Sequence, residues 1–289
     1  MRRRRWIGQV LAAGGALGLG LASRAAPMVR MRIGLTAVIL ADQAAFLSRW
    51  AAYLGERIDC EVSFAARDSY QVIEDMLAAD QIDAAWVCGY PYVQHEAHWR
   101  LIAVPLYHAQ PLYQSYLIRP SSTTGRSVSG WADLRGKVLA YSDPLSNSGW
   151  LVGQEQLALA GIRPRDMRRT FFAHGHRNVA EAVAAQLADA GCIDGYVWET
   201  MREQRMAAAL RTEVVWKSRL HGFPPIVAKR STTHPRMDAF EDALLSMPQT
   251  PAGRELLKAL NLDGFVRGDP STFDSIRRLA SSYGTPVVG

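Results

Sequence analysis

The sequence predicts two α/β lobes, with the second lobe inserted into the first. Short apolar segments alternate with helical patterns between residues 31 and 107, and the same alternation resumes between 137 and 210. Such alternation is typical of a mainly parallel sheet with helices on both faces. A loop rich in Ser, Thr and Gly at 120–130 separates the two sets. At 289 residues and 48% apolar content, the chain is long enough to fill two cores.

Residues 1–26 have the layout of an export signal and carry most of the positive charge. Arg2–Arg5 precede an apolar run, and small residues at 22–26 offer a cleavage site. Paired arginines followed by Trp and Ile favour twin-arginine export, with an ordinary Sec signal or an uncut anchor as alternatives. The formal charge of +6 falls to +1 without the five arginines of this leader, which gives no support for nucleic-acid binding.

Lobe 1 is expected at 27–112 and again at 217–289, after the chain returns. Its strands are expected at 31–39, 60–66, 82–88, 101–107 and 225–230, and its helices at 44–54, at 69–77 after Asp68 and Ser69, and near 236–247, 251–260 and 271–283.

Lobe 2 is expected at 113–216. Its strands are expected at 137–142, 168–174, 193–198 and 214–216, and its helices at about 147–161, 177–190 and 199–210. Segments near 113–119 and 212–220 would be the two crossings between the lobes. Paired crossing strands form a hinge, and ligands bind between such lobes near the carboxyl ends of the strands.

The stretch 141–150, with the sequence YSDPLSNSGW, joins a buried strand to a helix in lobe 2. Ser and Asn are preferred at helix N-termini, because their side chains accept hydrogen bonds from the free N–H groups of the first turn. That turn also offers N–H donors and a partial positive charge to an anion. The stretch therefore predicts either an ordinary capped helix or an anion site.

Several segments, in this order, resemble one family. IDAAWVCGYPYV at 82–93, YQSYLIRPSS at 113–122, WADLRGKVLAYSDPLSNSG at 131–149 and FFAHGHRNVAEAV at 171–183 are similar to the substrate-binding proteins of phosphonate and phosphite ABC transporters. The resemblance covers about residues 31–230. It implies a type II periplasmic-binding-protein fold, with two lobes, each a mainly parallel sheet flanked by helices, joined by two crossing strands.

The same resemblance implies a set of ligand-binding residues. Where the family usually has Gly and Thr, this chain has Leu145 and Asn147, so the anion itself stays open. Alternatives also stay open for individual side chains, since Tyr70 could cover the core, His176 could start a helix without touching a ligand, and Glu199 could interact with its own helix. As a ligand contact, the Glu199 carboxylate would suit an amine at the far end of the ligand. The full expected set is Tyr70, Tyr92, Ser146, Asn147, Ser148, His176, Tyr196 and Glu199.

The function expected from the resemblance is capture of a small oxyanion in an interlobe cleft, for delivery to an ABC permease in the inner membrane. The protein would be a periplasmic monomer, with no catalytic residue, metal or cofactor. Alternatives are a sulfonate, a thiamine precursor or a ligand read by a sensor kinase, or an enzyme on the same fold. Cys60, Cys88 and Cys192 have no paired spacing and are expected as buried free thiols.

Overall fold

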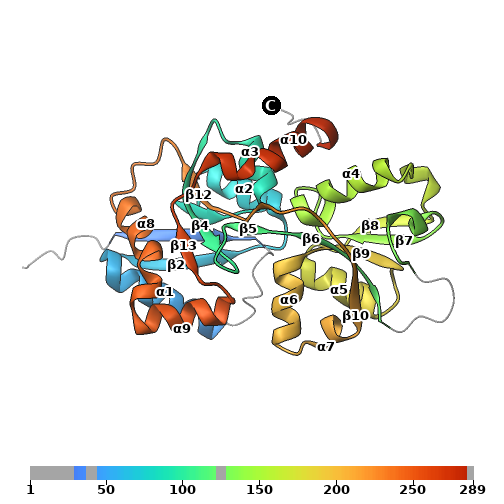
Figure 1. Cartoon of the computed structure of the whole chain (residues 1–289). Coiled ribbons are helices and arrows are strands. Elements are labelled where there is room, and N and C mark those ends of the chain that lie inside the picture. Colours follow the sequence, from blue (N-terminus) through green and yellow to red (C-terminus); the bar gives the residue numbers. More distant parts are fainter. Residues whose placement is uncertain (1–28, 37–43, 122–127, 285–289) are drawn as a thin grey trace, which may run out of the picture.

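The computed structural model describes residues 29–36, 44–121 and 128–284, in two lobes that lie side by side (Figure 1). The predicted leader, at 1–26, and the end of the first predicted strand lie outside these residues.

Lobe 1 is built on a six-stranded sheet in the order β13-β4-β12-β3-β1-β2. The parallel pairs β1–β2 and β1–β3 place Ile33 between Phe64 and Ala84, and the strands that return from lobe 2 join antiparallel. The strands are β1 Arg30–Leu35, β2 Glu61–Ala66, β3 Ala84–Trp86, β4 Trp99–Leu106, β12 Ile226–Lys229 and β13 Gly264–Val266, and the helices are α1 Ala44–Ile58, α2 Tyr70–Ala78, α3 Gly89–Gln94, α8 Met237–Leu245, α9 Pro251–Leu260 and α10 Asp274–Tyr283.

Lobe 2 is built on a five-stranded sheet in the order β10-β6-β9-β7-β8. Strands β8 and β9 both pair with β7 in parallel. Strand β6 pairs antiparallel with β9 on one side and with β10 on the other. The strands are β6 Ser115–Pro120, β7 Val138–Tyr141, β8 Arg169–Phe172, β9 Ala190–Asp194 and β10 Thr212–Lys217, and the helices are α4 Val152–Leu159, α5 His176–Ala184, α6 Gly195–Glu203 and α7 Ala207–Leu210.

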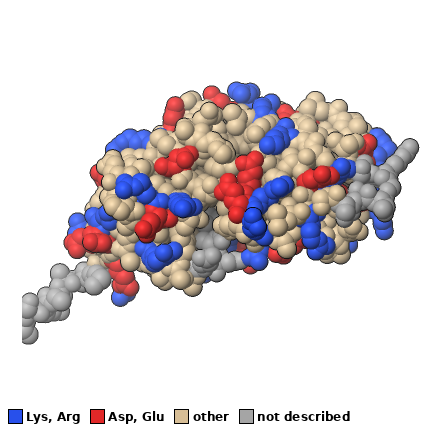
Figure 2. Space-filling model, turned by 60° about the horizontal axis from the view of Figure 1, so that its bottom comes forward, with Lys and Arg blue, Asp and Glu red and all other residues tan. Residues whose placement is uncertain are grey.

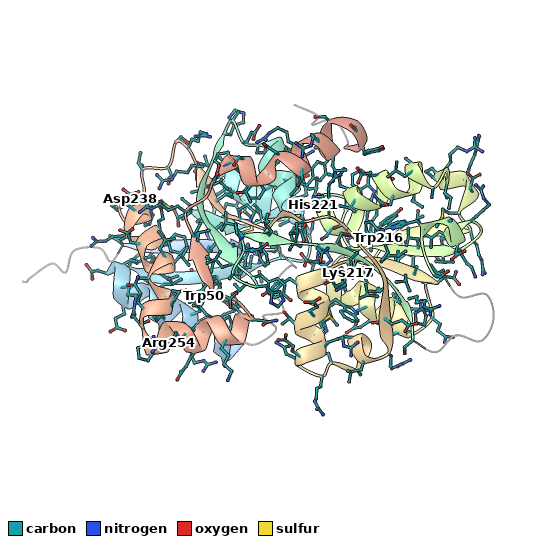
Figure 3. The ribbon with its side chains drawn as sticks, in the orientation of Figure 1. Trp50, Trp216, Lys217, His221, Asp238 and Arg254 are labelled. Carbon is teal, nitrogen blue, oxygen red and sulfur yellow. The ribbon has the colours of Figure 1, made fainter. Side chains whose placement is uncertain are left out.

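A two-stranded ladder links the lobes. Strand β5 (Leu112–Tyr113) pairs antiparallel with β11 (His221–Gly222). Strand β5 leads into β6 of lobe 2, and β11 follows β10 where the chain leaves lobe 2. Figure 3 places Lys217 and His221 near this passage. Most of the two segments predicted as crossings belongs to the sheet of lobe 2, so the connection is short.

One predicted strand, at 193–198, is wrong beyond its first two residues. Strand β9 ends at Asp194, and helix α6 begins at Gly195, so residues 196–198 are helical. The Asp194 side chain accepts a hydrogen bond from Val197 N at 3.3 Å, which is the bond of an N-cap residue. The apolar residues of this segment suggested a strand because a short buried helix shows the same run of apolar residues.

The core of lobe 1 is aromatic where α1 meets the sheet. Trp50 stacks on Phe64 at a centroid distance of 4.8 Å and meets Trp86 edge-on at 6.0 Å. This apolar core continues into lobe 2 through buried residues of β6, α4 and α5. The two lobes are therefore in apolar contact, and solvent is excluded from this part of the boundary between them.

The cysteine prediction is confirmed, since Cys60, Cys88 and Cys192 are buried free thiols. Within the described part of the chain, no helix has both the length and the apolar character of a membrane span. Within the same residues, no group of three or more His, Cys, Asp or Glu side chains is placed to hold a metal ion.

Two helix starts give a matched test of capping. Thr250 caps α9, because its hydroxyl accepts from Gly253 N at 3.1 Å, whereas Ser69 at the start of α2 makes no such side-chain bond. Thr250→Ala is expected to lower the free energy of unfolding by about 1 kcal/mol. Ser69→Ala is expected to change it by less than half as much. Urea unfolding of both variants measures this, and equal losses would contradict the assignment.

Candidate functional site

The stretch 141–150 forms a tight turn that leads into an irregular first helical turn. Ser146 is the N-cap, and its Oγ accepts from Gly149 N at 2.9 Å. Residues Asn147–Leu151 form a π-type turn, in which Leu151 N donates to Ser146 O at 3.0 Å, before α4 continues from Val152. The capping prediction for this stretch is confirmed, and the wide turn is the kind of local irregularity often found at functional sites.

A glycine is required at 149 because Ser142 lies against it. A Cβ atom at this position would lie 1.8 Å from Ser142 Oγ and 2.7 Å from Ser142 Cβ. The two segments are also tied by Ser142 N, which donates to Gly149 O at 3.2 Å. The end of β7 and the π-type turn are therefore packed closely against each other at the Ser142 hydroxyl.

Two hydrogen bonds join the turn to lobe 1. Tyr70 N, at the first position of α2, donates to Asp143 Oδ2 at 3.3 Å. Asn147 N donates to Cys88 Sγ at 3.2 Å, just beyond the carboxyl end of β3. Asp143 therefore accepts from the N-terminus of α2 across the lobe boundary, where the side chain of Ser69 makes no capping bond.

Tyr70 and His176 also meet across this boundary. Tyr70 Oη lies 3.3 Å from His176 Nε2, and His176 Nδ1 accepts from Asp194 N at 3.1 Å. Because Nδ1 is an acceptor, the ring proton is on Nε2 and points to the tyrosine. Burial lowers the pKa of His176 to about 3, so the ring is neutral at physiological pH. The proton of the Tyr70 hydroxyl is then available to another acceptor.

The crossing strand supplies two further polar groups. Asn147 Nδ2 donates to Tyr113 Oη at 3.0 Å, and Ser115 Oγ donates to Ser148 O at 2.6 Å. Both Tyr113 and Ser115 are buried. Three elements of different origin, namely α2, the crossing strand and the π-type turn, thus converge on one buried polar cluster.

Three polar atoms of the cluster have no hydrogen-bond partner among the described residues. They are Ser142 Oγ, Asn147 Oδ1 and Ser148 Oγ, and each is buried. Leaving a buried polar atom unpaired costs about 1–3 kcal/mol, so such atoms are rare and usually have a reason. The two unpaired hydroxyls can each donate to an oxyanion, whereas the Asn147 Oδ1 atom can only accept and would need a protonated oxygen of the ligand as its donor.

The structure brings together five of the eight predicted ligand residues: Tyr70, Ser146, Asn147, Ser148 and His176. Their roles differ, because the Ser146 hydroxyl is already used by Gly149 N.

The other three predicted residues make contacts elsewhere. Tyr92 packs against Phe273 at 4.8 Å. The Tyr196 hydroxyl donates to Leu260 O at 2.5 Å, and its ring meets that of Phe223 edge-on at 5.0 Å. Their bonds give no sign of a ligand contact, and their assignment stays a prediction.

Glu199 belongs to a separate network at the lobe boundary. Its carboxylate accepts hydrogen bonds from Tyr107 and Tyr116, and Lys217 Nζ and His108 Nε2 each lie 3.6 Å from it. Burial opposes ionisation, but these bonds outweigh it and lower the pKa of Glu199. A cavity of about 290 Å³ lies beside this carboxylate. Figure 2 shows acidic and basic side chains interspersed over one face of the molecule, with acidic ones gathered near its middle.

Ser142 and Asp143 lie in the predicted stretch but were not among the expected ligand residues, and three further participants were missed from the sequence. Tyr113 and Ser115 were assigned to a crossing strand and given no chemical role, and Cys88 was expected only as a buried thiol. Burial raises the pKa of Cys88 to about 11, so it acts here as a neutral acceptor. Alternation along 113–119 could have indicated that Tyr113 and Ser115 share a face.

Comparison with known proteins supports a single family. Residues 35–273 match the model of the family described as ABC transporter, phosphonate, periplasmic substrate-binding protein. The chain is 26% identical over 243 residues to the phosphonates-binding periplasmic protein of Escherichia coli K12, covering 81% of this chain and 70% of that protein.

Two solved structures share the fold. The binding-protein component of an ABC phosphonate transporter from Pseudomonas aeruginosa superposes with a TM-score of 0.78 at 20% identity, covering 87% of this chain and 85% of that one. A Prochlorococcus marinus protein in complex with methylphosphonate gives 0.74 at 16% identity, covering 87% and 97%. The predicted two-lobe fold is confirmed, but each sheet is mixed rather than mainly parallel, because β12 and β13 in lobe 1 and β6 and β10 in lobe 2 pair antiparallel.

Gly149→Ala tests the packing of the turn. The added methyl group would overlap Ser142, and overpacking of this kind costs about 1–3 kcal/mol of unfolding free energy. Gly130→Ala is a matched control, since a Cβ there meets nothing within 4 Å and its backbone is extended, with φ 179°. Urea unfolding should show a loss only for Gly149→Ala. Two equally stable variants would mean that the turn is looser than described.

Proposed function

The chain belongs to the family of periplasmic substrate-binding proteins of phosphonate ABC transporters, and on that premise we propose that it holds a small phosphonate-like oxyanion at the buried polar cluster between its lobes. The ligand would then be delivered to a permease in the inner membrane, and the protein would act as a monomer exported by the twin-arginine or Sec route.

The observation that carries the proposal is the set of unpaired atoms at the lobe boundary. Ser142 Oγ and Ser148 Oγ can each donate to an anion oxygen, and the Tyr70 hydroxyl has a proton to offer. The start of a helical turn adds a favourable dipole. Hydrogen bonds to a charged acceptor are roughly twice as strong as neutral ones, so a few neutral donors suffice.

The contacts of Glu199 favour a ligand without an amine. Its carboxylate is already held by two tyrosine hydroxyls and lies near Lys217. Each carboxylate oxygen already accepts one hydrogen bond, and Lys217 already lies 3.6 Å away, so an amine on the ligand would gain less from this carboxylate than from a free one. The other predicted far-end contact, Tyr196, is tied to Leu260. Methylphosphonate or phosphite is therefore proposed ahead of 2-aminoethylphosphonate, and the methylphosphonate-bound relative is in line with this choice.

The rival functions make different predictions in a single assay. A binding protein raises its melting temperature with its ligand and leaves that ligand chemically unchanged. A thermal-shift panel of methylphosphonate, phosphite, 2-aminoethylphosphonate, taurine and thiamine separates the ligand classes. Phosphorus NMR of the recovered ligand separates binding from turnover. Consumption of the ligand, or a shift with thiamine alone, would overturn the proposal.

Ser148→Ala should separate ligand binding from folding. Its hydroxyl has no partner within the described residues, so its removal should leave the unfolding free energy unchanged or slightly higher. The affinity for methylphosphonate should fall by about 1–3 kcal/mol, roughly tenfold to a hundredfold. Calorimetric titration measures this, with the exposed Ser281→Ala as the control. Wild-type affinity in Ser148→Ala would remove this hydroxyl from the site.

Asp194 should make anion binding depend on pH. Burial raises the pKa of Asp194 to about 8, so its carboxyl is neutral below that pH and negative above it. Burial is the largest cause of the raised pKa of Tyr70, and the charges of Asp143 and Asp194 raise it further. Asp194 therefore acts on the cluster through its charge. Because a second negative charge repels the anion, affinity should weaken as pH rises through about 8.

The variant Asp194→Asn isolates this effect, since it keeps the acceptor that caps α6 and removes the titration. Titrations with methylphosphonate from pH 7 to 9.5 should show a fall of about tenfold in the wild type beyond that in the variant. The ligand's own protonation is common to both proteins and cancels in the comparison. Parallel pH profiles would contradict the role given to Asp194.

A further inference from the structure

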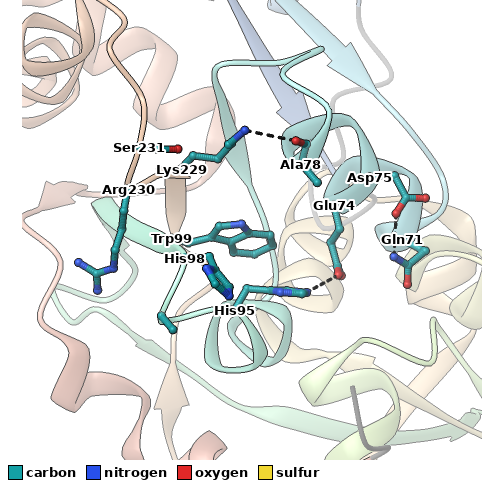
Figure 4. A pocket seen from close by; sticks show the side chains of 11 residues that line it. Gln71, Glu74, Asp75, Ala78, His95, His98, Trp99, Lys229, Arg230 and Ser231 are labelled. Carbon is teal, nitrogen blue, oxygen red and sulfur yellow. Dashed lines mark hydrogen bonds and ion pairs between the residues drawn. The ribbon is translucent and has the colours of Figure 1, made fainter. Parts of the chain in front are cut away.

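A second cavity lies wholly within lobe 1. It is bounded by α2, the end of α3, the start of β4 and the end of β12, and its volume is about 400 Å³ (Figure 4). Small-molecule sites typically fall between about 300 and 1,000 Å³. Because both its walls belong to one lobe, its shape does not require the lobes to meet. The polar cluster and this cavity share α2, with Tyr70 at the first position and Glu74 one turn later.

Glu74 is the buried charge-bearing group of this cavity. Its exposed fraction is 5%, and its Oε2 lies 3.1 Å from His95 Nε2. Its Oε1 is buried and receives no hydrogen bond from any described residue. Burial raises the pKa of Glu74 in spite of the bond to His95. A buried carboxylate oxygen with no donor is costly, so the charge of Glu74 is only partly compensated by its bond to His95.

The two cations at the rim do not donate to the Glu74 carboxylate. Lys229 Nζ is held at 2.7 Å from Asp80 Oδ1 and at 3.2 Å from Ala78 O. The Arg230 guanidinium donates to Glu96 O at 3.2 and 3.0 Å. Figure 4 shows the Arg230 side chain pointing away from Glu74 and the Lys229 side chain pointing to Ala78, while the Glu74 carboxylate points to His95.

The remaining wall is aromatic and apolar. The His95 ring lies 4.7 Å from the ring of Trp99, with an interplanar angle of 34°. Ala78 and Ala97 also line the cavity. Flat rings next to a carboxylate suit an alkyl chain that carries a positive charge, because the chain packs on the rings and the charge faces the aromatic surface and the anion.

We propose that this cavity binds an organic cation, an alkylammonium or alkylguanidinium group, whose positive charge is held by the Glu74 carboxylate and whose alkyl part packs against Trp99 and His95. The site is distinct in charge and in place from the oxyanion cluster. The cation can be part of a free small amine or the basic side chain of another protein, and both share this chemistry.

Calorimetric titration of the purified full chain with agmatine tests the proposal. One site per chain is expected, and Glu74→Gln should weaken binding about tenfold or more, because a charge-assisted bond becomes a neutral one. Gln has nearly the same shape as Glu, and methylphosphonate binding in the same variant shows that the fold is intact.

Asp75→Asn is the matched control, since it removes one negative charge from the exposed rim, where Asp75 accepts from Gln71 Nε2 at 3.0 Å. It should change agmatine affinity by less than about threefold. A similar loss in both variants, equal affinity of Glu74→Gln and wild type, or no agmatine binding by the wild type would each overturn the proposal.

A second arm identifies the source of the cation. Displacement of agmatine by the peptide acetyl-Gly-Arg-Gly-amide would support a site that accepts a protein side chain. Retention of agmatine under excess peptide would support a site for free amines only.

Discussion

The lobe boundary depends on one constraint, the burial of polar groups that the protein itself does not satisfy. Ser142, Asn147 and Ser148 each bury a polar atom without a partner among the described residues. Each such atom opposes the folded arrangement by about 1–3 kcal/mol. A bound oxyanion removes this cost for the Ser142 and Ser148 hydroxyls, so the approach of the two lobes and the capture of the ligand become one thermodynamic event. In the absence of ligand, the same cost favours their separation.

Each hydrogen bond that holds the lobes together joins a residue of lobe 1 to a residue of lobe 2. Asp143 of lobe 2 accepts from the first N–H of α2 in lobe 1, and Cys88 of lobe 1 accepts from Asn147 of lobe 2. Tyr70 meets His176 across the same boundary. Because lobe separation breaks all of these bonds at once, the cluster is complete only when the lobes meet. The Glu199 network adds a further contact between the lobes, outside the cluster.

The sequence was sufficient for features that depend on local pattern. Alternating apolar segments predicted two sheets, and the Ser- and Asn-rich turn predicted a helix start, while the anion site there stays a prediction. It failed where a residue's partner is distant in sequence. The local pattern could not relate the Tyr196 hydroxyl to Leu260 O, its partner 64 residues away. In addition, the apolar run extended the predicted strand to residue 198, although Asp194 caps a helix that begins at Gly195. Tyr113 was missed because a crossing strand was treated as a connector.

A crystal structure of the protein with methylphosphonate tests the central claim most directly. The account predicts one phosphonate group at the lobe boundary, with its oxygens within hydrogen-bond distance of Ser142 Oγ, Ser148 Oγ and the Tyr70 hydroxyl, and the Glu199 carboxylate still bonded to its two tyrosines. A phosphonate bound in the cavity beside Glu199 and Lys217, with the Ser142 and Ser148 hydroxyls still unpaired, would contradict it.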